Sequence, residues 1–215
     1  MCGRYELKVT AKELVKFVPH LSLEQRQMPA ADEMRPMDSL LMLTRHADGY
    51  VGSKARWGLV GNFLANEPPN PPINLRSEGL VDKPFYSKIL KGNRCLIPAT
   101  AFFEWSHIAG GGKQKMRFSH AKGKPLLFAG VFDQHRLAGT TCAIVTTQAN
   151  ESVGRIHDRM PVILGLEQSA FWLDAYGDFP ADEFDEVMRA SSRCVLRIEA
   201  ETEPEISPQL AFAFT

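Results

Sequence analysis

Residues 95–147 read CLIPATAFFEWSHIAGGGKQKMRFSHAKGKPLLFAGVFDQHRLAGTTCAIVTT. Short runs of apolar and β-branched residues recur in this stretch, and glycines or polar residues separate them, which is typical of strands joined by turns. The pattern predicts five strands, at Cys95–Ile97, Ala101–Ile108, Lys115–Ser119, Leu126–Gln134 and Thr140–Thr147. Strands that follow one another through short turns pair antiparallel. We therefore predict a largely antiparallel, partly barrel-like β core.

The flanking sequence predicts helices and further strands around this core. Thr10 and Glu13 fit a capping box at the start of an apolar-periodic helix. Further helices are predicted at residues 84–90, 167–176 and 181–190, and strands at 3–9, 39–46, near 51, 160–164 and 195–199. Residues 28–38 are expected to form an irregular loop, and the four prolines within residues 62–74 predict an extended one. We expect a single α+β domain over residues 1–215, with peripheral helices.

The composition is that of an average soluble globular protein. Hydrophobic residues make up 44% and charged residues 23% of the 215 positions, which excludes disorder and collagen-like repeats. Lys plus Arg and Asp plus Glu each number 25, so a nucleic-acid partner requires a local basic patch. No apolar run approaches the ~18 residues of a membrane span, and no signal-peptide pattern follows Arg4. We expect a cytoplasmic protein without a membrane partner.

The cysteines and histidines show no metal-binding or disulfide pattern. The four cysteines are far apart in the sequence, and the six histidines lack ligand spacing. Cys95, Cys142 and Cys194 are expected to be small buried hydrophobic residues. We expect no metal and no cofactor, and we expect a monomer.

Cys2 carries the most chemical information in the sequence. A small second residue permits removal of Met1, which leaves Cys2 with a free α-amine beside its thiol. The amine titrates near ~7.7–8.0 and the thiol near ~8.5, so reactive forms of both exist at physiological pH. Such a 1,2-aminothiol condenses with an aldehyde to an imine and then closes a thiazolidine ring. An incidental cysteine is the alternative interpretation.

Three other segments carry residues suited to acid–base chemistry. Glu104 lies between two bulky aromatic residues, where desolvation is expected to raise its pKa. His157 precedes an apolar strand, and an imidazole exchanges protons near neutral pH. Asn74 and Arg76 close the proline-rich loop. Taken singly, each has an ordinary structural interpretation: Glu104 paired at a sheet edge, His157 capping a turn and Asn74 ordering its own loop.

Together these segments resemble one protein family, the SOS-response-associated peptidases (SRAP). The resemblance rests on Met1–Tyr5, Trp57–Gly58, Ile73–Glu78, Arg94–Pro98 with Phe103–Trp105, and Ile156–Pro161. It spans about residues 2–172, and residues 190–215 are divergent. The resemblance implies a single-domain α+β protein that binds single-stranded DNA, senses abasic sites and crosslinks its N-terminal cysteine to the open-chain sugar aldehyde. The peptidase label reflects proposed self-processing of the N-terminus.

The resemblance also implies catalytic roles for four residues of this chain. Cys2 would be the nucleophile, and Asn74 would position the ring-opened sugar. Glu104 and His157 would transfer protons during ring opening, imine formation and the lyase-like reversal of the crosslink. All four residues are present.

A second group of residues is implied in DNA binding. Arg4, Arg76 and Arg159 would bind phosphates or organise the site, and Trp105 would lie beside the damaged nucleotide or in the core. Phe63 stands where relatives carry a tryptophan that wedges against bases. The family's early Asn-x-Ala-Pro stretch is replaced by Glu-Met-Arg-Pro at residues 33–36.

Two other functions compete with this interpretation. Class II glutamine amidotransferases also begin Met-Cys-Gly and use a processed N-terminal cysteine as nucleophile. They continue with an apolar segment, whereas this chain continues Arg4-Tyr5-Glu6. A non-catalytic module that binds single-stranded DNA would use the basic and aromatic residues without needing Cys2. A Cys2→Ala variant separates that module from the crosslinking protein.

Overall fold

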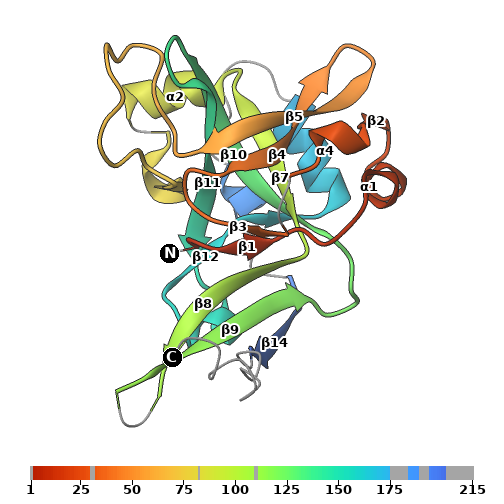
Figure 1. Ribbon diagram of the computed structural model, residues 1–215, viewed down its shortest axis with the longest axis vertical. Helices are drawn as coiled ribbons and strands as arrows, with labels where there is room; N and C mark the ends of the chain where they lie inside the picture. Colours follow the sequence, from red (N-terminus) through yellow and green to blue (C-terminus); the bar gives the residue numbers. More distant parts are fainter. Residues whose placement is uncertain are drawn as a thin grey trace, which may run out of the picture.

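A closed β-barrel forms the upper part of the molecule as drawn in Figure 1. The computed structural model describes residues 2–29, 32–81, 83–108, 111–174, 184–188 and 194–201. The barrel strands are β4 (Ser39–His46), β5 (Gly49–Trp57), β7 (Arg94–Ala99), β10 (Leu126–His135) and β11 (Gly139–Gln148). They pair in the order β5-β4-β7-β10-β11, and β11 closes the barrel through parallel pairing with β5 at Thr141–Arg56 and Cys142–Trp57.

A second sheet lies beside the barrel. Its strands are β1 (Tyr5–Glu6), β3 (Glu33–Met34), β8 (Ala101–His107), β9 (Lys113–His120) and β14 (Leu196–Ala200). They pair antiparallel in the order β14-β9-β8-β1-β3. Strands β8 and β9 form a long hairpin that extends away from the barrel, with β14 along its edge (Figure 1).

Shorter strands and a few helices complete the fold. The short strands are β2 (Leu21–Ser22), β6 (Asn74–Arg76), β12 (Arg159–Pro161) and β13 (Ile163–Leu164). The helices are α1 (Ala11–Phe17), α2 (Pro84–Leu90), α3 (Glu151–Gly154) and α4 (Leu166–Asp174), with 3-10 turns at Gln25–Gln27 and Ser77–Gly79 and a helical segment at 184–188. Strands β2 and β6 run parallel to β5 and β11, and the remaining pairings outside barrel closure are antiparallel. The predicted α+β class with a largely antiparallel, partly barrel-like core is confirmed.

Aromatic packing between the sheets fixes the start of the chain. The ring of Tyr5 in β1 lies 5.4 Å from that of Trp57 and 6.0 Å from that of Phe128, both on barrel strands. Phe102 of β8 lies 6.1 Å from Phe128 and stacks on Phe118 of β9 at 4.8 Å. All five side chains are buried, and such pairs contribute about 0.5–1.5 kcal/mol each beyond their buried area. The residues just before Tyr5 are thereby held at the junction of the two sheets.

Local sequence signals explain the best-predicted elements. The Thr10 hydroxyl accepts the Glu13 backbone N–H at 3.2 Å, and the Glu13 carboxylate accepts the Thr10 N–H at 2.7 Å, so the capping box of α1 is confirmed. Helix α2 begins at Pro84, a residue that favours the first turn because it needs no backbone donor there. Strand β4 also has the predicted bounds.

Several predicted elements needed correction. Residues 28–38 are not wholly irregular, because Glu33 and Met34 pair with β1. The strand predicted near residue 51 extends over all of β5. The strand predicted at 160–164 is two strands, because Val162 donates its N–H to Val145 of β11 and accepts a hydrogen bond from Ala129 of β10. Parts of the helix predicted at 181–190 lie outside the described residues.

The free cysteines match their predicted burial only in part. Cys95 and Cys142 are fully buried, whereas Cys194 is half-buried beside the core. Within the described ranges, no group of three or more His, Cys, Asp or Glu is placed to hold a metal ion. Nor does any helix in those ranges combine the length and apolarity needed to cross a bilayer. A single domain over residues 1–215 stays a prediction.

Candidate functional site

Cys2 lies at the junction of the two sheets and is completely buried. Its carbonyl oxygen accepts a hydrogen bond from the side-chain amide of Asn74 at 2.9 Å. Its thiol donates to the backbone carbonyl of Arg4, with sulfur and oxygen 3.7 Å apart. The Arg4 carbonyl also accepts the N–H of Phe103 on β8 at 3.0 Å. Strands β6 and β8 therefore hold residue 2 from two sides.

The thiol of Cys2 is held in its protonated form. Burial is the main cause that raises its pKa from an ordinary value of 9.0 to about 12, and the charge of the nearby Glu104 carboxylate contributes in the same direction. The sequence led us to expect some thiolate at physiological pH, and the buried position corrects that expectation. A proton acceptor or a concerted proton transfer is needed before the sulfur can react as a thiolate.

Glu104 is the buried carboxyl group of the site. It lies in β8 opposite Met116 of β9, and its side chain is 5% exposed. Burial raises its pKa, while the charge of the neighbouring His157 acts in the opposite direction. The predicted desolvation of this carboxyl group is confirmed. A carboxyl group with a raised pKa is suited to carry a proton in reactions near neutral pH.

His157 faces Glu104 from the loop that precedes β12. Its Nε2 lies 4.0 Å from a carboxylate oxygen of Glu104. The backbone N–H of Arg159 donates to its Nδ1 at 3.0 Å, and the carboxylate of Asp158 is 3.0 Å from the same nitrogen. Contacts at Nδ1 thus fix the orientation of the ring, and Nε2 is the nitrogen that faces Glu104. The pair is thus arranged for proton exchange.

Arg159 organises the segment next to this pair. Its guanidinium binds both carboxylate oxygens of Glu78, at 2.6 and 2.9 Å, and donates to the backbone carbonyl of Thr146 at 2.7 Å. The arginine side chain is only 8% exposed, and its hydrogen bonds lower the pKa of Glu78. Bidentate geometry of this kind fixes both partners. Arg159 therefore connects β12 to β11 and to the turn that follows β6, and most of its donors are already engaged.

A cleft of about 380 Å³ opens beside Asn74. It is lined by Pro72, Asn74, Leu75, Arg76, Glu78, Gly79, Lys83 and Tyr86. Arg76 is exposed, and the buried side-chain oxygen of Asn74 has no hydrogen-bond partner within the described part of the chain. The cleft thus has an exposed cation at its edge and lies beside a buried acceptor without a partner among the described residues. The sequence did not point to Lys83 or Tyr86, because local signals alone explain helix α2, which Lys83 precedes and to which Tyr86 belongs.

Arg4 and Trp105 form a contact on the second sheet. The Arg4 guanidinium carbon lies 5.9 Å from the centroid of the half-buried Trp105 ring. The same guanidinium donates to the Glu33 carboxylate at 2.9 Å. Arg4 is therefore an ion-paired side chain, and Glu33 is a partner that the sequence did not indicate.

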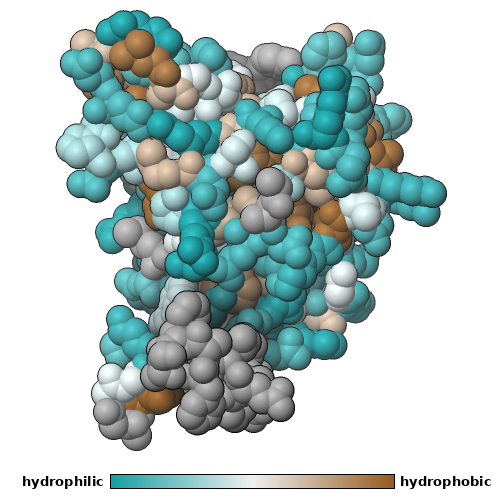
Figure 2. All heavy atoms as spheres, in the orientation of Figure 1, coloured by the Kyte–Doolittle hydropathy of each residue, from teal (hydrophilic) through white to brown (hydrophobic). Residues whose placement is uncertain are grey.

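Phe63 is exposed on the loop between β5 and β6. Its side chain is 64% exposed, and its ring packs edge-on against that of Phe85 at 4.6 Å. Strand β10 holds this loop, because the Asp133 carboxylate accepts the Asn62 N–H at 2.7 Å. Figure 2 shows hydrophobic atoms at the upper left, where this loop lies, and others at the centre and right of the same face.

The structure thus brings together the four residues singled out for catalysis. A hydrogen bond connects Cys2 with Asn74, the charge of Glu104 acts on the Cys2 thiol, and Glu104 lies 4.0 Å from His157. These residues come from the N-terminus, β6, β8 and the loop before β12, so long-range packing assembles the group.

A comparison with protein families matches residues 1–200 to the family described as SOS response associated peptidase (SRAP). The chain belongs to the SRAP family. Its curated relatives include the abasic site processing protein YoqW of Bacillus subtilis, 32% identical over 180 residues that cover 81% of this chain and 80% of the relative. Another SRAP-family relative is the abasic site processing protein HMCES of Gallus gallus, 34% identical over 163 residues, covering 62% of this chain and 48% of that protein.

Solved structures of two bacterial proteins show the same fold. A protein from Bacteroides thetaiotaomicron superposes with a TM-score of 0.76 at 18% identity and covers 94% of this SRAP chain and 92% of its own. One from Bordetella bronchiseptica gives a TM-score of 0.70 at 22% identity, with coverage of 94% and 100%. At these identities the likeness concerns the fold.

Proposed function

We propose that this chain processes abasic sites in single-stranded DNA and becomes covalently linked to them through Cys2. The observation that carries the proposal is the group formed by Cys2, Asn74, Glu104 and His157 at the meeting of the two sheets. The printed names of its relatives, abasic site processing proteins, support the same conclusion. An abasic sugar supplies the electrophile, because its ring-opened form carries an aldehyde.

The covalent step joins the aldehyde to both functional groups of Cys2. After loss of Met1, the α-amine attacks the aldehyde carbon to give a carbinolamine, which loses water to form an imine. The sulfur then bonds to the imine carbon while the thiol proton passes to the nitrogen, and a thiazolidine results. One water leaves overall. A thiol held protonated next to the Glu104 carboxyl group suits this step, because its proton has to move as the ring closes.

Asn74 would orient both reactants. Its amide group already binds the Cys2 carbonyl at 2.9 Å, and its side-chain oxygen faces no protein donor among the described residues. That oxygen is available to accept a hydroxyl of the opened sugar. Holding two reactants in a fixed geometry removes much of the entropic barrier to their reaction.

Glu104 and His157 would move the protons that the reaction requires. Opening the closed sugar transfers a proton from the anomeric hydroxyl to the ring oxygen, and loss of water from the carbinolamine requires a proton donor. The raised pKa of Glu104 allows it to carry a proton, and the Nε2 atom of His157 lies 4.0 Å from its carboxylate. The same transfers in reverse would release the DNA, which is the lyase-like part of the activity.

DNA contacts are proposed for four side chains around this group. Arg76 in the cleft and Arg4 beside Cys2 would bind backbone phosphates, and the exposed Phe63 and the half-buried Trp105 would stack on bases. Arg159 would act by organising Glu78 rather than by binding phosphate directly. The zero formal net charge makes local placement of these cations decisive.

Two measurements test the proposal. Adding residues ahead of Cys2, or retaining Met1, should abolish stable crosslinking to abasic DNA with little change in affinity, because the amine is then acylated. Arg76→Gln should make the slope of log K against log salt shallower by about 0.7, the value for one phosphate contact on a single strand. A normal crosslink from a chain that retains Met1, identified by mass, would refute the thiazolidine mechanism.

A further inference from the structure

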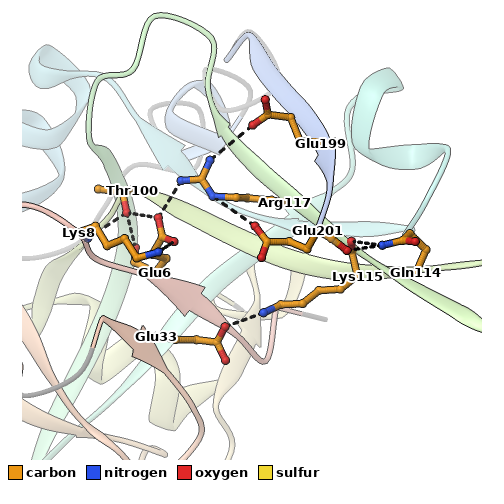
Figure 3. Close-up of polar contacts among 9 residues, drawn as sticks. All are labelled: Glu6, Lys8, Glu33, Thr100, Gln114, Lys115, Arg117, Glu199 and Glu201. Atoms are coloured by element: carbon orange, nitrogen blue, oxygen red, sulfur yellow. Dashed lines mark hydrogen bonds and ion pairs between the residues drawn. The ribbon is translucent and has the colours of Figure 1, made fainter. Parts of the chain in front are cut away.

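Glu33 is shared by three cations near the N-terminus. It lies on the edge strand β3, opposite Glu6 of β1. One carboxylate oxygen accepts a hydrogen bond from Arg4 at 2.9 Å, and the other accepts one from Lys115 at 2.6 Å (Figure 3 shows the Lys115 contact). A guanidinium nitrogen of Arg35 lies 3.8 Å from the first oxygen. A single carboxylate therefore occupies the centre of a cationic cluster.

Aromatic rings also hold two of these cations in place. The Lys115 ammonium lies 3.9 Å from the centroid of the Phe103 ring, and the Arg4 guanidinium carbon lies 5.9 Å from that of Trp105. Cation–π contacts of this kind persist without the carboxylate. The Arg4 and Lys115 side chains are 29% and 26% exposed, so an external anion can reach them.

Glu33 is ionised at neutral pH. Partial burial acts to raise its pKa, but hydrogen bonds from Lys115 and Arg4 outweigh that effect and keep the pKa below its usual range. The neighbouring Glu6 forms its own ion pair with Arg117 at 2.7 Å (Figure 3), so its charge does not neutralise that of Arg4. The charge on Glu33 is thus the one that faces the Arg4 and Lys115 donors.

We propose that Glu33 is an internal anion that competes with a DNA phosphate for Arg4 and Lys115 and so limits the affinity of this chain for undamaged single strands. The inference rests on the proposed binding of single-stranded DNA. Carboxylate and phosphate accept from the same donors, so a phosphate at this position has to displace the carboxylate or lie beside its negative charge. Strands without an abasic site are then released, because they form no covalent bond that offsets the competition.

Glu33→Gln tests the competition, because the amide keeps the size of the side chain and removes its charge. The control is Glu24→Gln, which changes the net charge equally at an exposed carboxylate paired with Arg26. Undamaged single-stranded DNA of fixed length is titrated with each variant over a range of salt. For Glu33→Gln we expect tighter binding and a slope of log K against log salt that is steeper by about 0.7. The ratio of its affinity to that of the wild type should therefore be about threefold larger at ~50 mM than at ~200 mM salt. Glu24→Gln should match the wild type.

Glu33→Asp is the second test variant. Glu33→Asp keeps the charge and should keep the wild-type slope, and thermal melting reports the folding of each variant. The competition is overturned if Glu33→Gln leaves the salt slope unchanged or binds undamaged DNA more weakly. It is also overturned if Glu24→Gln raises the affinity as much as Glu33→Gln does, or if Glu33→Asp does so. A wild type that crosslinks abasic DNA while Glu33→Gln binds undamaged strands no better refutes this inference alone. A wild type that binds no single strand refutes the proposed function as well.

Discussion

The buried thiol of Cys2 should react far more slowly in the folded chain than in the unfolded one. Its pKa of about 12, against an ordinary 9.0, is a difference of three units, or about 4 kcal/mol. The thiolate is the form that reacts with alkylating agents, so its fraction at neutral pH falls by about a thousandfold. The lack of solvent access at a fully buried side chain slows the reaction further.

Iodoacetamide labelling with peptide mass mapping measures this difference directly. The rate at Cys2 is compared between native chain and chain unfolded in urea, at one pH near neutrality. Cys194 serves as an internal reference, because it is half-buried and should be protected less. Glu104→Gln should speed labelling of Cys2 yet leave it much slower than in urea, because the carboxylate contributes less than burial to the raised pKa.

A modest protection would refute this account of the site. If native Cys2 is labelled within tenfold of its rate in urea, the thiol is neither deeply buried nor held protonated. If Glu104→Gln leaves the rate unchanged while the chain stays folded, the carboxylate does not influence the thiol.

Three further predictions concern the proton-transfer pair and its support. His157→Ala or Glu104→Gln should slow single-turnover crosslinking at least about tenfold without abolishing it. If the dependence of the rate on pH is the same in both variants as in the wild type, the two residues have only structural roles. Glu104→Gln should also raise the melting temperature at pH 7. A raised pKa means that folding disfavours the ionised carboxyl group, so the gain should vanish below the unfolded pKa of ~4.3, and calorimetry against pH checks this sign. Glu78→Gln should lower the free energy of unfolding in urea by about 1–3 kcal/mol, because the buried Arg159 loses its ionic partner.

Strand and helix bounds were predictable where the signal is local. Strand β4 is an apolar run next to a turn, and α2 starts at Pro84, so both have the predicted bounds. Strand β3 was not predictable, because Glu33 and Met34 become a strand only through pairing with β1. The division of the strand predicted at 160–164 was not predictable either, because it depends on hydrogen bonds of Val162 to β10 and β11.

The site was predictable in its members but not in its electrostatics. The sequence singled out Glu104 from its aromatic neighbours, and the structure buries it as expected. The shift in the pKa of Cys2 depends on burial by strands far away in the chain, so the sequence alone predicted that some thiolate would be present. The pairing of Arg159 with Glu78, 81 residues apart, and that of Arg4 with Glu33 also depend on the folded sheets. Long-range pairs of this kind leave no spacing signal.

The central claim is that Cys2 forms a covalent bond with an abasic site. The most direct test is the intact mass of the protein after incubation with single-stranded DNA that carries one abasic site, with Cys2→Ala as the control. We predict a species equal to the chain without Met1 plus the oligonucleotide minus one water, stable without a reducing agent and absent from Cys2→Ala. The same stable species in Cys2→Ala, or no adduct with wild type, would contradict the account.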